Sequence, residues 1–70
     1  MDMYQFVLNE VFNYTKTSGA YPTFRDLRGK TRMRSGELLY YLRELVHTDR
    51  VQINKTLNVR RYVPVIEREE

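Results

Sequence analysis

The sequence predicts an α+β domain in which three helices are followed by a β-hairpin. Apolar residues recur with the spacing of amphipathic helices through the first two thirds of the chain, and the period changes to strand-like alternation beyond Asp49. Seventy residues form one domain, which at this size buries only about 60% of the unfolded chain's surface. We therefore expect one small-cored domain over residues 1–64 and an acidic, frayed tail over 65–70.

The first helix is predicted from Met3 to about Lys16. Its apolar positions recur at i, i+3, i+4, i+7 and i+8 and define one buried stripe: Tyr4, Val7, Leu8, Val11 and Phe12. Phe6 falls close to the opposite side of this helix. Two interpretations of Phe6 stay open, a single exposed aromatic or part of a self-association patch.

A short second helix follows the turn at 17–22, where Gly19 suits the left-handed C-cap position. Thr23 and Asp26 have the spacing of a capping box, with Asp in place of the usual Glu. Phe24 and Leu27 would point inward. We expect Gly29 to end this helix after about a turn and a half.

The third helix is expected from Arg34 or Ser35 to His47, with Ser35 as its cap. Three leucines spaced four and three residues apart define its buried stripe: Leu38, Leu42 and Leu45. At about 100° per residue, the far side of this helix carries Gly36, Tyr40, Arg43 and His47.

Beyond Asp49 the pattern is typical of a hairpin. Val51–Ile53 and Val59–Val63 are rich in β-formers, and the asparagines of 54–58 favour a turn with Lys55 at its tip. Alternation sends Arg60 and Tyr62 to one face and Arg61 to the other. Tyr62 is expected to pack against the helices, and Pro64 to end the second strand.

The formal net charge is +3, and the basic residues are concentrated in the middle of the chain. Residues 23–63 carry ten Lys and Arg against Asp26, Glu37, Glu44 and Asp49. Such a block attracts polyanions, and phosphate contacts supply most of the sequence-independent affinity for nucleic acid. A solvated basic surface without a partner is the alternative that charge alone leaves open.

Other function classes find little support. The chain has no cysteine and one histidine, His47, so neither a disulfide, a metal cluster nor a nucleophile-base pair is expected, and we predict no enzyme, cofactor or small-molecule ligand. No apolar run approaches the roughly 18 residues of a membrane span, and the N-terminus lacks the basic start of a signal peptide. A soluble cytoplasmic protein is expected.

Three helices and a hairpin, with a short second helix joined tightly to a longer third, are the elements of a winged helix-turn-helix, whose third helix enters the major groove of duplex DNA. Arg43 suits guanine or phosphate, Tyr40 suits phosphate or a thymine methyl, and Gly36 permits close approach. The predicted DNA-binding residues are Arg32, Arg34, Ser35, Gly36, Glu37, Tyr40, Arg43, Lys55, Arg60 and Arg61. Glu37 is included as an acceptor for cytosine N4, although it also suits the helix dipole and would repel phosphate.

The segments SGELLYYLREL (35–45), HTDRVQI (47–53) and RRY (60–62) resemble the recognition helix and wing of repressors of the ArsR, PadR and MarR type. YPTFRDL (21–27) resembles the entry to helix two in SOS repressors. The resemblance implies a transcriptional regulator, often a dimer on a palindromic operator, and by analogy of size a compact viral or mobile-element regulator. The chain departs from the pattern in having no glycine in the wing turn and Asp49-Arg50 before the first strand.

Two further expectations concern partners. The same fold could serve as a protein-interaction module that binds a polymerase or a host factor, and fold alone does not separate the two functions. A homodimer is expected because one small domain offers little of the roughly 1,000–2,500 Å² that specific DNA interfaces bury. Its candidate contacts are Phe6, Val65 and Ile66.

Overall fold

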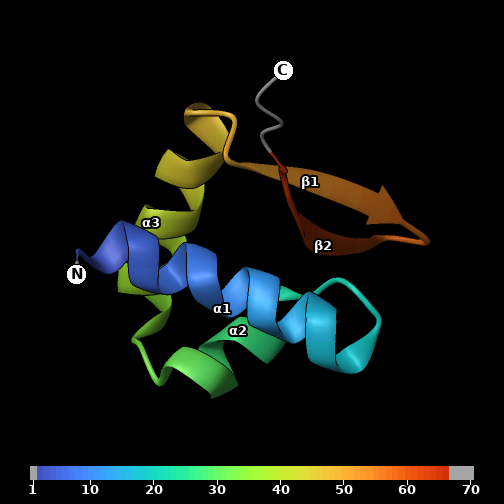
Figure 1. The fold of residues 1–70 in the computed structure, drawn as a ribbon, viewed down its shortest axis with the longest axis horizontal. Helices are drawn as coiled ribbons and strands as arrows, with labels where there is room; N and C mark the ends of the chain where they lie inside the picture. Colours follow the sequence, from blue (N-terminus) through green and yellow to red (C-terminus); the bar gives the residue numbers. More distant parts are fainter. Residues whose placement is uncertain (1, 67–70) are drawn as a thin grey trace.

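A computed structural model of the chain describes residues 2–66. It contains α1 (Met3–Ser18), α2 (Phe24–Thr31), α3 (Ser35–His47), β1 (Val51–Thr56) and β2 (Val59–Pro64), with the two strands antiparallel (Figure 1). The predicted α+β class and the order of its elements are confirmed. No helix among the described residues is long and apolar enough to cross a membrane.

Helix α1 begins and ends with specific caps. The side chain of Asp2 accepts a hydrogen bond from the Gln5 amide at 2.7 Å, and Gly19 adopts the predicted left-handed conformation at the C-terminus, with φ 75°. The prediction that Phe6 lies on an exposed back face of α1 is wrong, because Phe6 is half-buried against the core. Helix α1 contacts α2, α3 and β2, so its buried face is wider than the single stripe predicted.

The capping box at the start of α2 is confirmed. Thr23 Oγ1 accepts from the Asp26 amide at 3.2 Å, and the Asp26 carboxylate accepts from the Thr23 amide at 3.0 Å. The predicted end at Gly29 is wrong. The helix continues to Thr31, because Arg32 itself adopts the left-handed conformation, with φ 59°, and its amide bonds the Arg28 carbonyl.

Helix α3 runs over the predicted residues, but Ser35 is not its cap. Arg34 occupies the N-cap position, since its carbonyl accepts the first helical hydrogen bond from the Leu38 amide, and its side chain makes no capping bond. Ser35 is therefore the first helical residue. Met33, in the connector between α2 and α3, is buried.

The hairpin strands are longer than predicted. Val59 pairs with Thr56 across a two-residue turn, Leu57 and Asn58, both with positive φ as in a type I′ turn. This tight turn matches the twist of the strands, so pairing extends almost to the tip. Lys55 consequently lies within β1 rather than at the tip.

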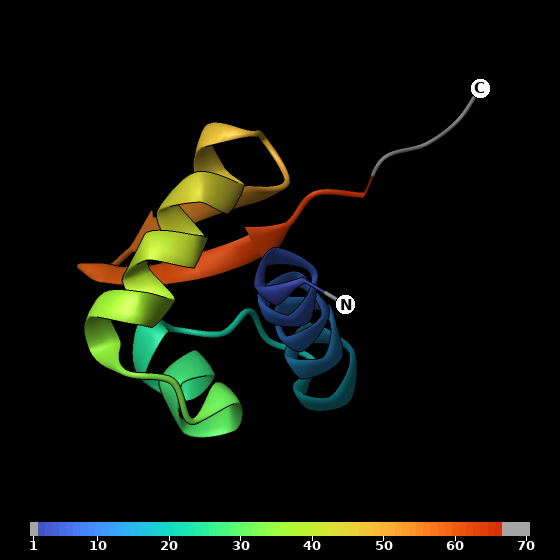
Figure 2. The ribbon, with the colours of Figure 1, turned by 90° about the vertical axis from the view of Figure 1, so that its left-hand side faces the viewer.

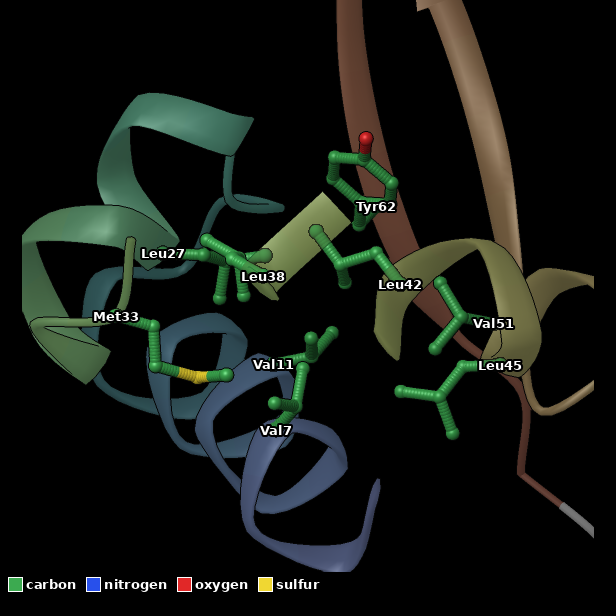
Figure 3. Close-up of a cluster of buried hydrophobic side chains, with 9 residues drawn as sticks. All are labelled: Val7, Val11, Leu27, Met33, Leu38, Leu42, Leu45, Val51 and Tyr62. Carbon is green, nitrogen blue, oxygen red and sulfur yellow. The ribbon is translucent and has the colours of Figure 1, made fainter. Parts of the chain in front are cut away.

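The core draws on every element (Figure 3). Its nine buried side chains are Val7, Val11, Leu27, Met33, Leu38, Leu42, Leu45, Val51 and Tyr62. Burial of the predicted leucine stripe of α3 and of Tyr62 is confirmed. Among the described residues no buried side-chain nitrogen or oxygen lacks a hydrogen-bond partner.

Strand β2 is tied to the chain before α2. The Tyr62 amide donates to the Pro22 carbonyl at 2.8 Å, and Arg61 forms an isolated bridge with Thr23. These contacts fix the hairpin relative to the helices. Beyond β2 the Val65 amide bonds the Arg50 carbonyl at 3.0 Å, and the rest of the predicted tail, 67–70, lies outside the described residues.

Candidate nucleic-acid interface

The leucine stripe of α3 packs into the core, and the opposite face of this helix is exposed. Gly36, Tyr40 and Arg43 lie on this face, as predicted, and line a shallow hollow with Leu39 and Glu44. A Cβ added at Gly36 would meet no atom within 4 Å. The first turn of α3 can therefore approach a partner surface closely.

A groove separates α3 from the hairpin, and we call it the α3–wing groove. Its volume is about 650 Å³, and it is lined by Leu39, Leu42, Arg43, Glu44, Val46, His47, Ile53, Arg60 and Tyr62. Arg43 comes from α3 and Arg60 from β2, so two cationic side chains from separate elements reach one groove. Figure 2 shows α3 crossing in front of the hairpin, with α1 seen nearly end-on to the right.

The hairpin carries its own pair of cations. Lys55 and Arg60 are directly opposite each other in the strand register, and both are exposed. Like charges at such positions destabilise a hairpin, so a bound anion between them would relieve the repulsion. Their position in paired strands places both on the face that carries Ile53 and Tyr62.

The residues that lead into α3 are exposed. Arg32 and Arg34 flank the buried Met33 in the connector, and Ser35 and Glu37 follow in the first turn of α3. Glu37 is favourably placed for the helix dipole, which is a structural reason for an acid there. The two arginines bring positive charge to the end of α3 where a groove-binding helix meets the DNA backbone.

Arg61 has a structural role instead. It is half-buried on the opposite face of the hairpin from Arg60, and its guanidinium donates to the Tyr21 carbonyl at 2.7 Å. The pKa of the Asp26 carboxyl is lowered, chiefly by the hydrogen bond from the Thr23 amide, with a smaller contribution from the charge of Arg61. We therefore remove Arg61 from the candidate interface.

Tyr40 is held by α1 rather than standing free. Tyr4 donates a hydrogen bond from its hydroxyl to that of Tyr40 at 3.1 Å, and both rings contact Tyr41. This hydrogen bond, aided by partial desolvation, raises the pKa of Tyr4 to about 12. Tyr40 is still 53% exposed, so part of its ring and hydroxyl remains accessible on the α3 face.

Sequence reasoning missed two apolar residues and one acid at this site. Leu39 and Ile53 are 42% and 44% exposed in the α3–wing groove, which Glu44 also lines. The sequence did contain a sign that Leu39 faces the groove. Leu39 and Val46 lie seven residues apart on one side of the helix, with Arg43 between them. Ile53 had no such signal, since its position depends on the hairpin register.

The helices, the tight connector and the hairpin together match the winged-helix topology. Comparison of the chain with protein-family models, with curated proteins and with solved structures gave no significant match. The likeness to a winged helix is therefore one of topology alone. Within residues 2–66, no three His, Cys, Asp or Glu side chains gather as ligands of a metal ion would.

Proposed function

We propose that this protein binds double-stranded DNA sequence-specifically and acts as a small transcriptional regulator. Helix α3 would enter the major groove, and the hairpin would contact the backbone or the minor groove. The observation that carries this proposal is the meeting of Arg43 and Arg60 in one groove beside an uncovered helix face. Two exposed cations on either side of a groove suit a phosphate strand that runs between helix and wing.

The individual residues would have different tasks. Arg43 would read guanine O6 and N7 or hold a phosphate, and Gly36 would allow the first turn to approach the bases. Arg32 and Arg34 would clamp backbone phosphates. Lys55 and Arg60 would do the same from the hairpin. Tyr40 accepts the hydrogen bond from Tyr4 and keeps its own hydroxyl proton, so it would contribute its ring and a hydrogen bond to a phosphate.

The test is fluorescence anisotropy with a random-sequence duplex pool at two salt concentrations, followed by selection and sequencing of the bound DNA. Binding that weakens steeply with salt and enriches one sequence would support a specific DNA-binding regulator. An enriched inverted repeat would add a two-fold arrangement of protomers. Absence of binding even at low salt would contradict the proposal.

A second candidate is a winged-helix protein-interaction module. The observation that favours it is the apolar lining of the α3–wing groove, because Leu39 and Ile53 are both exposed there. Apolar anchors in a groove suit a protein partner such as a polymerase or a host factor. Partner capture that survives high salt, without DNA binding, would favour this function.

We also propose a homodimer, which keeps Val65 and Ile66 of the predicted contacts and leaves out Phe6. Phe6 packs against the core, whereas Val65 and Ile66 line a hollow with Leu8 and Phe12 of α1. A second domain would extend the small DNA footprint. Analytical ultracentrifugation that finds only monomer at tens of micromolar would contradict the dimer without affecting DNA binding by single domains.

A further inference from the structure

The tip of the hairpin carries an unexpected residue. Leu57 is 91% exposed, more than any other large hydrophobic residue described, and it projects from the turn between β1 and β2. Figure 1 shows this tip pointing away from α3, among the outermost parts of the fold. The leucine side chain therefore adds nothing to the packing of the core.

The backbone at Leu57 is also unfavourable for leucine. Its φ is 52°, in the left-handed region, and the next residue, Asn58, has φ 65°. Two-residue turns of this kind favour Asn-Gly or Asp-Gly, because a Cβ is disfavoured at positive φ and most strongly for bulky residues. Leucine at this position costs stability through its conformation, and because the side chain stays exposed it gains no burial that would compensate.

The surroundings of Leu57 are cationic. Lys55 lies two residues before the leucine and faces Arg60 across the strands. At roughly 3.4 Å per residue, this pair stands about 7 Å behind the tip. The tip of the hairpin thus exposes an apolar side chain, and two positive charges face each other across the strands behind it. Val59, next to the turn, is exposed as well.

We propose that Leu57 enters the minor groove of duplex DNA and contacts its sugars and base edges, with Lys55 and Arg60 on the phosphates that border the groove. This inference rests on the proposed DNA binding and names the part of the duplex that the hairpin reads. The minor groove is roughly 6 Å wide and 7.5 Å deep, so it admits a tip of one side chain but not two strands with their side chains. Apolar side chains are a recurring means of contact there, and phosphates line both walls.

An apolar protein surface would match Leu57 but not the opposed cations behind it. DNA accounts for both features. Like charges across a hairpin repel, and two phosphate-lined walls supply the anions that neutralise them. The observations therefore favour the minor groove over an apolar partner for this tip.

The decisive variant is Leu57→Asn, because asparagine tolerates the left-handed conformation. We expect Leu57→Asn to raise the thermal unfolding midpoint and yet to weaken binding to a defined A·T-rich duplex by roughly tenfold, the effect of losing one buried leucine contact. Asn58→Gly is the matched control. It relaxes the same turn and keeps the leucine, so its midpoint should rise while its affinity stays at the wild-type value.

Competition with netropsin, which fills the minor groove of A·T-rich duplexes, supplies a second readout. Once netropsin is bound, the affinities of the wild type and Leu57→Asn should become equal. Wild-type affinity in the folded Leu57→Asn variant, or an advantage of leucine that persists with netropsin, would overturn the minor-groove inference alone. Failure of the wild-type protein to bind any duplex would overturn the proposed function and this inference together.

Discussion

Arg43 of α3 and Arg60 of β2 line the same groove, although one belongs to a helix and the other to a strand that pairs only after the hairpin forms. The register that brings them together also places Tyr62, two residues after Arg60, in the core. Arg61, between them, turns to the opposite face and binds the Tyr21 carbonyl. Strand alternation therefore gives two adjacent arginines different positions. Arg60 lines the exposed groove, and Arg61 binds the hairpin to the segment before α2.

This division predicts opposite phenotypes for the two arginines. Arg61→Ala should lower the free energy of unfolding by about 1–2 kcal/mol, through loss of a charged hydrogen bond, and leave DNA affinity unchanged. Arg60→Ala should not lower stability, because it removes the like-charge repulsion with Lys55, and it should weaken DNA binding. Urea unfolding and fluorescence anisotropy measure the two quantities. If both variants lost the same property, the assignment of faces would be wrong.

The exposed helical glycines Gly29 and Gly36 form a second matched pair. Neither has an atom within 4 Å of an added Cβ, so alanine fits at both. Gly29→Ala in α2 should stabilise the domain by about 0.5–1 kcal/mol and leave DNA binding unaltered. Gly36→Ala should not destabilise the domain but should weaken DNA binding, because the new methyl group lies on the proposed reading face. Equal affinities for the two variants would show that α3 does not approach DNA through Gly36.

The capping box of α2 predicts an acid-dependent contribution to stability. The folded-state pKa of Asp26 is lowered below its ordinary value of 3.8, so its stabilising effect is fully present above that value and is lost as the pH falls through the folded-state pKa. Unfolding measured against pH should show a loss of stability below about pH 4 that is smaller in Asp26→Asn. Identical profiles for the two proteins would remove Asp26 as the source.

The Tyr4–Tyr40 hydrogen bond predicts a change at alkaline pH. Because the pKa of Tyr4 is raised from 10.0 to about 12, its stabilising effect is present below 10 and is lost as the pH rises through about 12. Burial also raises the pKa values of Tyr14 and Tyr62, so ultraviolet difference titration should find several late-titrating tyrosines, of which the one near pH 12 is absent from Tyr4→Phe. In Tyr40→Phe, Tyr4 should titrate closer to its ordinary value. An unchanged late phase in Tyr40→Phe would exclude this hydrogen bond as its cause.

Much of the fold could be predicted because its signals are local. The leucine spacing of α3, the capping box of Thr23 and Asp26, and Gly19 at the end of α1 each depend on a few neighbouring residues. Two of the errors, the end of α2 and the length of the hairpin strands, arose where residues other than glycine adopt positive φ. Arg32, three residues after Gly29, ends α2, and Leu57 and Asn58 close the hairpin.

The candidate site was harder to predict because it depends on contacts between distant parts of the chain. The outward positions of Gly36, Tyr40 and Arg43 follow from helical geometry alone. The Tyr4 hydroxyl on Tyr40 and the Tyr21 carbonyl on Arg61 do not, since no local pattern brings these pairs together. A one-residue change of hairpin register would have exchanged Arg60 and Arg61.

The most direct test of DNA binding through the α3–wing groove is the salt dependence of duplex affinity for the wild type and two variants that each remove one positive charge. Arg43→Ala removes a cation from the groove, and Lys16→Ala removes the same charge from the exposed last turn of α1. We predict that log affinity of the wild type falls linearly with log salt, by about 0.9 per phosphate contacted, and that Arg43→Ala weakens binding far more than Lys16→Ala. Equal losses in the two variants, or no wild-type binding at low salt, would contradict the account.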